Sequence, residues 1–185
     1  MSNSDLLPGL IPDRVCGSCV SCCSFFTIAE LNKPAGSLCR HSRSGGGCDI
    51  YDERPRACRI FFCAWRCWNE VPEDWRPDKT GFVLGGRLMP RRFLSVTTDP
   101  LLPESWRAEP YFSQLKIWAR QAAGMLSEVV VFSGKRVILL RPESEVDFGE
   151  VAADEVLIQD PDGHVAKVKR NDPRVTTAAP PPDLR

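Results

Sequence analysis

The sequence has only two histidines, no long apolar run and no net charge. No stretch approaches the roughly 18 consecutive apolar residues that a transmembrane helix needs, and the start, Met-Ser-Asn-Ser-Asp, lacks the basic flank and apolar run of a secretory signal. The 24 Lys and Arg balance the 24 Asp and Glu, which argues against broad attraction to nucleic acid or to an anionic membrane. We therefore expect a cytoplasmic protein whose partners include neither nucleic acid nor a membrane.

The sequence patterns of common cofactor-binding enzymes are also missing. No G-x-G-x-x-G element opens a helix and no G-x-x-x-x-G-K-[ST] loop is present, which argues against the common dinucleotide and nucleotide triphosphate sites. Gly81, Gly85 and Gly86 lie in a strand-like segment and make a weak case for a phosphate or S-adenosylmethionine loop. With two histidines, histidine-based acid/base catalysis has few options. The sequence assigns no catalytic residue, so whether the protein is an enzyme stays open.

Cysteine, in contrast, is concentrated in one part of the chain. All nine cysteines lie between Cys16 and Cys67, and the rest of the chain contains none. Secreted disulfide scaffolds are equally dense in cysteine, but the missing signal, the odd count and the long cysteine-free portion argue against them. In a reducing compartment, thiolates at two-residue spacings gather around zinc, iron or an iron–sulfur cluster. The sequence therefore predicts a metal-binding region.

The spacing of the cysteines leaves the number of metal centres open. The first group reads Cys16-Gly-Ser-Cys19-Val-Ser-Cys22-Cys23, and its small residues permit a tight turn that aims several sulfurs at one centre. Adjacent Cys22 and Cys23 point in divergent directions on a regular backbone, so either they serve two centres or one is spare. The later cysteines are too irregularly spaced for one local knuckle. We expect the chain to wrap back toward the first group. Eight sulfurs are enough for two four-thiolate sites, and the number of sites stays open.

The segment from Pro55 to Trp68 is predicted to be helical. Pro55 suits a first helical position and no breaker follows, so Cys63 and Cys67, four residues apart, would share one face. Arginines outnumber carboxylates in residues 40–66, where they either offset thiolate charge or coat the surface. The nearby aromatic residues either exclude water from a cluster or, as we favour, form core: Phe25, Phe26, Phe61, Phe62, Trp65 and Trp68.

Two motifs together resemble the YkgJ-type cysteine-cluster family. They are Cys-x-x-Cys-x-x-Cys-Cys at residues 16–23 and Cys-Asp-Ile-Tyr-Asp-Glu-Arg-Pro-Arg-Ala-Cys-Arg at residues 48–59, and the similarity covers roughly residues 14–68. The resemblance implies a domain that chelates zinc or iron. A domain of this type also occurs in flagellin lysine N-methylase, which implies a protein-modifying role in the wider family. The metal ligands that the resemblance implies are Cys16, Cys19, Cys22, Cys23, Cys39, Cys48, Cys58 and Cys63. Cys67 is left out, and His41 is an alternative ligand that nine cysteines make unnecessary.

The remainder of the chain predicts a small α+β unit. The residue content favours strands at 80–88 and 92–98 and a helix at 110–123, with Pro at its opening and Gly124 just beyond its end. Two hairpins are predicted: 129–132 with 135–140 around Ser133-Gly134, and 156–159 with 165–169 around Asp162-Gly163. His164 would be a strand-edge residue. The eight carboxylates from Glu143 to Asp162 favour a solvated loop over a site for a hard cation or a basic peptide.

These observations predict an α+β protein in which a small cysteine-rich metal-binding domain with short helices precedes an α+β domain with hairpins and one main helix. The expected divisions are a flexible start at 1–13, the cysteine domain at 14–70, a connector at 71–79, the α+β domain at 80–170 and a disordered tail at 171–185. The predicted function is chelation of zinc or iron, including an iron–sulfur cluster, with an unidentified protein as a further partner. The alternative is an iron–sulfur redox enzyme or a protein-modifying enzyme.

Overall fold

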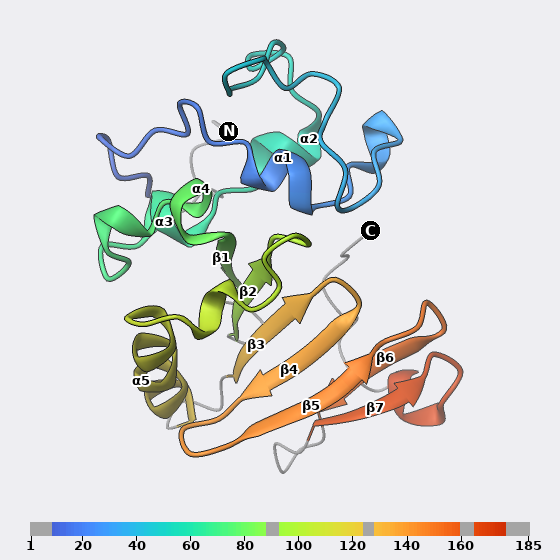
Figure 1. Cartoon of the computed structure of the whole chain (residues 1–185). Helices are drawn as coiled ribbons and strands as arrows, with labels where there is room; N and C mark the ends of the chain where they lie inside the picture. The colour runs from blue at the N-terminus through green and yellow to red at the C-terminus, as the bar shows by residue number, and fades with distance from the viewer. Residues whose placement is uncertain (1–8, 88–92, 124–127, 160–164, 177–185) are drawn as a thin grey trace.

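The computed structural model describes residues 9–87, 93–123, 128–159 and 165–176 and has an α+β fold (Figure 1). Short helices occupy the cysteine region: α1 (Ser21–Phe25), η2 (Ala29–Leu31), α2 (Arg56–Ile60), α3 (Ala64–Cys67), η3 (Glu73–Trp75) and α4 (Pro77–Thr80). The later elements are β1 (Phe82–Arg87), β2 (Phe93–Thr98), η4 (Ser105–Arg107), α5 (Tyr111–Ala123), β3 (Glu128–Ser133), β4 (Arg136–Leu140), β5 (Glu145–Glu150), β6 (Glu155–Gln159), β7 (Val165–Lys169) and η5 (Pro173–Thr176). No helix in this part of the chain is long and apolar enough to cross a membrane.

Five strands form one sheet in the order β1-β2-β3-β4-β5. Neighbouring strands are antiparallel except β2 and β3, which run parallel with Val96 opposite Val131. A parallel pair needs a long crossover connection, and α5 lies in that connection and packs against β3 and β4. β6 and β7 form a separate two-stranded sheet, visible beside β5 in Figure 1.

The secondary structure predicted after residue 80 is largely confirmed. The two predicted strands contain β1 and β2, and the predicted helix is α5. β3 and β4 form the predicted hairpin, but Ser133 pairs with Arg136, so the two loop residues are Gly134 and Lys135. Gly134 adopts a φ of 61°, which explains why glycine stands there. β6 and β7 pair as predicted; Gly124, the Asp162-Gly163 turn and His164 lie outside the described residues.

The prediction of a solvated loop over the acidic run is wrong, because β5 forms the edge of the main sheet within it. Its carboxylates meet arginines from other elements. Arg107 donates from both terminal nitrogens to Glu145, at 2.8 and 2.7 Å, and Arg136 of β4 pairs with Asp147. These cations come from distant segments of the sequence, so the run looked uncompensated when it was considered alone.

The continuous helix predicted after Pro55 is also wrong. Pro55 is the N-cap of α2, which ends at Ile60, and the chain is extended at Phe61 and Cys63 before α3 begins. The ring of Phe61 packs against that of Phe26, with centroids 5.0 Å apart, and this contact gives the extended segment its packing partner. Cys63 is the N-cap of α3, so it does not lie on one long helix with Cys67.

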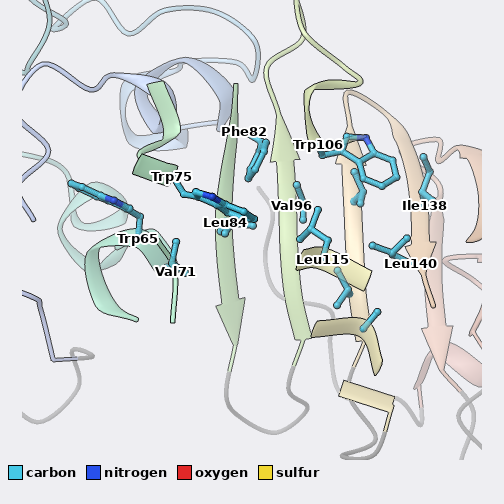
Figure 2. Packing of buried hydrophobic residues seen from close by; sticks show 14 residues of the cluster. Trp65, Val71, Trp75, Phe82, Leu84, Val96, Trp106, Leu115, Ile138 and Leu140 are labelled. Carbon is cyan, nitrogen blue, oxygen red and sulfur yellow. The ribbon is translucent and has the colours of Figure 1, made fainter. Parts of the chain in front are cut away.

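One hydrophobic core joins the cysteine region to the sheet. Figure 2 shows Trp65 and Val71 beyond the outer side of β1, with Trp75 and Phe82 next to them. The ring of Trp75 lies edge-on to those of Phe82, Tyr111 and Trp118, at 6.0, 4.9 and 5.6 Å between centroids. The buried core residues are Ala64, Trp65, Val71, Trp75, Phe82, Leu84, Val96, Trp106, Leu115, Ala119, Val129, Val131, Ile138 and Leu140. The predicted domain boundaries therefore fall within a continuous core, and they stay predictions.

Candidate metal site

All nine cysteines are free thiols, and they lie around α1, α2 and α3 in the upper part of Figure 1. Cys39 is buried and the other eight are partly buried. Within the described ranges, no three or more His, Cys, Asp or Glu side chains are arranged to hold a metal ion. The structure therefore shows which residues lie near each cysteine, but it shows no coordination geometry.

Four cysteines line one small cavity. They are Cys16, Cys19, Cys22 and Cys63, here called the cavity cysteines, and the wall is completed by Trp65, Arg66, Arg76, Pro77 and Val83. The cavity has a volume of about 20 Å³, which is room for about one water molecule. The predicted return of the chain toward the first cysteine group therefore occurs at Cys63.

Local backbone structure places the cavity cysteines. The amide of Cys19 donates to the carbonyl of Cys16 at 2.8 Å, which closes a turn. Gly17 within that turn has a φ of 53°, a conformation that favours glycine. Cys22 lies in the single turn of α1 that follows, and Cys63 caps the start of α3. The small residues between the cysteines thus serve the predicted purpose of a tight turn.

A short segment that contains Ile11 and Arg14 is hydrogen-bonded to α3 beside the cavity. The amide of Ile11 donates to the carbonyl of Arg66 at 2.9 Å, and Arg14 donates to the carbonyls of Trp65 and Trp68 at 2.8 and 3.1 Å. Arg66 in turn donates from Nη1 to the carbonyl of Arg14. Arg66 is only 8% exposed, and its buried Nε has no hydrogen-bond partner within residues 9–87, 93–123, 128–159 and 165–176.

Burial favours the protonated form of three cavity thiols, those of Cys16, Cys22 and Cys63. It raises the pKa of Cys63 to about 12, a rise that the backbone amide of Arg66 partly offsets. It also raises the pKa of Cys16, against the opposing charge of Arg66. Hydrogen bonding with Cys23, together with burial, holds the pKa of Cys22 well above that of a free thiol. Because metals bind thiolates, loading these residues would release protons.

Four other cysteines are neighbours of one another. They are Cys23, Cys39, Cys48 and Cys58, here called the loop cysteines. The amide of Cys39 donates to the carbonyl of Cys23 at 3.1 Å. Cys48 is held near Cys39 through Ser42, which forms a β-bridge with Cys48 and donates its amide to Cys39 at 3.0 Å. Cys58 interacts electrostatically with the other three.

A buried lysine lies beside the loop cysteines. The ammonium of Lys33 donates to the carbonyls of Ser24, Phe26 and Pro34 at 2.9, 2.5 and 3.0 Å. Burial lowers the pKa of Lys33, and the thiols of Cys39 and Cys23 oppose that change most strongly. The pKa of Cys23 falls to about 7, first through its hydrogen bond with Cys22 and further through the charges of Lys33 and Arg54. Cys23 is therefore the thiol that ionises most readily among those with a shifted pKa.

Two supporting residues hold the segment that carries Cys58. The carboxylate of Glu30 accepts the amides of Arg56 and Ala57, both at 3.0 Å, at the start of α2. Arg54 lies over the ring of Tyr51, 3.6 Å from its centroid, and donates to the Tyr51 carbonyl at 2.7 Å. Sequence reasoning did not identify Glu30 because its partners lie far along the chain.

The sequence analysis also missed Lys33, although one signal was available. Lys33 is the only lysine before Lys79, in a region that otherwise uses arginine. Of the arginines expected either to offset thiolate charge or to coat the surface, Arg54 and Arg66 act on thiols. Arg43 instead forms an exposed pair with Asp49. The predicted offset of thiolate charge at a metal stays a prediction.

The residues left out of the predicted ligand set lie differently. Cys67 follows Arg66 at the end of α3 and does not line the cavity. Burial raises its pKa, against the charge of Arg66. His41 accepts a hydrogen bond from Arg40 at 3.3 Å. Gly85 and Gly86 pair with Ser95 and Leu94 inside the β1–β2 ladder, so they form no phosphate loop.

Comparisons with known proteins do not assign a function to the chain. No family model, no curated protein and no solved structure matches it. The resemblance to the YkgJ-type family therefore rests on the two cysteine motifs and stays a prediction.

Proposed function

We propose that the chain binds a thiophilic metal, zinc or iron, through its cysteine-rich region. The observation that carries this proposal is the cavity lined by Cys16, Cys19, Cys22 and Cys63, which come from two segments distant in sequence. Four thiolates are the complete ligand set of a closed tetrahedral zinc site, and they also suit iron. Such a closed site would contribute folding free energy and leave no coordination position for a substrate.

The residues around the cavity fit a metal held by thiolates. Four thiolates around a divalent ion leave a net charge near minus two, and buried Arg66 supplies a positive charge together with a donor, Nε, that has no partner in the described part of the chain. Trp65 and Val83 exclude water from the same wall. Hydrogen bonds and burial around thiolate ligands are the usual means by which a protein stabilises and tunes such a site.

The size of the cavity favours a single ion over a cluster. A space of about 20 Å³ accommodates one small ion, whereas a four-iron cluster would require the walls to move apart. We therefore propose metal binding as the function and keep an iron–sulfur redox enzyme, or a protein-modifying enzyme of the kind implied by the family resemblance, as the alternative.

The nine free thiols indicate in which cellular compartment the protein works. Thiols persist unpaired where glutathione and thioredoxin keep them reduced. We therefore propose that the protein works in the cytoplasm.

Elemental analysis of protein purified without oxygen tests the proposal, together with its visible absorption spectrum. A colourless sample that contains zinc supports a structural metal site. A brown sample that contains iron and acid-labile sulfide supports the iron–sulfur alternative. A folded protein that contains neither metal would overturn the proposal.

Two matched variants at the ends of α3 test the ligand assignment. Cys63→Ser removes a cavity cysteine and is expected to lower the metal content. Cys67→Ser makes the same substitution at a residue outside the cavity, and the metal content is expected to stay unchanged. If Cys67→Ser alone lost metal, the assignment would be wrong.

A further inference from the structure

Two buried cations in the cysteine region require an explanation. Within the described ranges, Lys33 and Arg66 are the charged side chains that are buried, at 6% and 8% exposed. In that same part of the chain, neither forms an ion pair with a carboxylate. A buried charge without a counter-charge costs several kcal/mol. Each cation therefore needs a source of negative charge nearby.

For Lys33, that source is the loop cysteines. Its three hydrogen bonds go to the neutral carbonyls of Ser24, Phe26 and Pro34, which orient the ammonium but do not balance its charge. The ionisable groups that act on it most strongly are all thiols, led by Cys39 and Cys23. A four-thiolate metal centre would supply the missing negative charge.

For Arg66, the source is the cavity cysteines. Its Nη1 is engaged by the carbonyl of Arg14, but its Nε has no partner among the described residues. A buried donor without a partner destabilises the fold. Arg66 shares the cavity wall with Cys16, Cys19, Cys22 and Cys63, and sulfur bound to metal is an acceptor for such a donor.

The doubled cysteine divides the sulfurs between the two cations. Cys22 lines the cavity with Cys63 of the α3 segment, whereas the backbone of Cys23 is bonded to that of Cys39, on the side of α2. The thiols of these two residues are hydrogen-bonded to each other, so the two sets of sulfurs meet at this pair. Eight cysteines then separate into two sets of four, and Cys67 belongs to neither.

We infer that the cysteine region holds two separate metal centres, one on the cavity cysteines beside Arg66 and the other on the loop cysteines beside Lys33. This inference rests on the proposed function. Each centre has its own buried cation, which offsets one of the two negative charges left by four thiolates around a divalent ion. Lys33 and Arg66 are thus positioning residues that act through the thiolates.

Native mass spectrometry of the full chain, purified without oxygen and titrated with EDTA, tests this inference without any substitution. The expected result is a stepwise loss from two metal centres per chain to one and then to none. A chain that carries one centre would overturn the inference and leave the proposed function standing. A chain that carries no metal would overturn both.

Cysteine variants test how the sulfurs are divided. Cys63→Ser and Cys58→Ser are each expected to retain one centre, the double variant to retain none, and the control Cys67→Ser to retain two. If Cys63→Ser or Cys58→Ser lost both metal centres while its circular dichroism spectrum remained that of the wild type, the division of the cysteines into two sets would be wrong.

Substitution of the two cations tests their roles. Lys33→Met and Arg66→Met are each expected to accelerate metal release to EDTA from one centre by about 10- to 100-fold and to leave the other centre unchanged. Arg43→Met, at an exposed ion pair, is the control. Faster release from both centres in either variant, or unchanged release in both, would contradict the assignment of one cation to each centre.

Discussion

Gly46 lies against the backbone of Ser18: a Cβ built on Gly46 would be 2.2 Å from the Ser18 carbonyl oxygen. The two residues come from the loop that leads to Cys48 and from the turn between Cys16 and Cys19. Their contact therefore joins the loop that leads to Cys48 to the turn that carries Cys16 and Cys19, in addition to the direct link between Cys22 and Cys23.

Gly46→Ala is expected to separate these two segments. The residue has a φ of 97°, which a residue with a Cβ rarely adopts, and the new methyl group would collide with backbone that cannot rotate away. We expect a loss of about 2–4 kcal/mol in the free energy of unfolding and a lower metal content, measured by denaturant titration and elemental analysis.

Gly45→Ala is the matched control for this prediction. Gly45 has a similar φ of 90°, but a Cβ there would meet no atom within 4 Å. The free energy of unfolding of Gly45→Ala should therefore fall only by the strain of its backbone conformation, about 1–2 kcal/mol. Equal losses in the two variants would show that the contact with Ser18 is unimportant.

Leu115→Ala is expected to destabilise the sheet by about 2–5 kcal/mol. Leu115 is fully buried on the face of α5 that packs on β3 and β4, so its loss leaves a cavity. Ile117 lies two residues further along the same helix and is 45% exposed, so Ile117→Ala should cost less than about 0.5 kcal/mol. Chemical denaturation followed by circular dichroism measures both, and the prediction fails if the two losses are similar.

Glu145→Gln is expected to change how stability depends on pH. The hydrogen bond from Arg107 is the main cause that lowers the pKa of Glu145 in the folded chain. The carboxylate therefore stabilises the fold above its unfolded pKa of about 4.3, and this contribution is lost as the pH falls through the lower folded-state pKa. The partly exposed pair should contribute about 0.5–1 kcal/mol at pH 7.

Urea unfolding of both proteins between pH 7 and pH 2.5 measures this difference. The wild type should be the more stable at pH 7, and its advantage over Glu145→Gln should shrink below about pH 4. Glu150→Gln, an exposed change on the same strand, is the control. An advantage that stayed constant down to the lowest pH would contradict the role of Arg107.

Glu30→Ala is expected to destabilise the segment that carries Cys58. The variant loses the acceptor for the amides of Arg56 and Ala57, which should cost about 1 kcal/mol, the usual effect of removing a helix cap. Thermal unfolding measures the loss, and Glu53→Ala, an exposed change just before α2, is the control. Identical melting temperatures for the two variants would argue against this cap.

The strands and the main helix were predictable because their signals are local. β-branched and aromatic runs end at turn residues such as Gly134, and α5 follows Pro110 with its apolar residues on one face. The break between α2 and α3 was not predictable in this way. It depends on the packing of Phe61 against Phe26, a contact between segments far apart in the sequence.

The candidate ligands were predictable as a set, but their neighbours were not. Spacing identified the doubled cysteine and raised two centres as one possibility, yet it did not show that Cys22 faces Cys63 or that Cys23 lies with Cys39. The buried state of Lys33 likewise depends on three carbonyls that fold around its ammonium. A sequence gives residue types, whereas burial and charge pairing arise from tertiary packing.

The cysteine region also covers one edge of the main sheet. Its residues Trp65 and Val71 lie beyond the outer side of β1 in Figure 2. β1 is an edge strand of the main sheet, and an uncovered edge recruits strands from other molecules. α3, which carries Trp65, begins at Cys63. The cysteine region thus covers an edge of the sheet to which strands of other molecules would otherwise add.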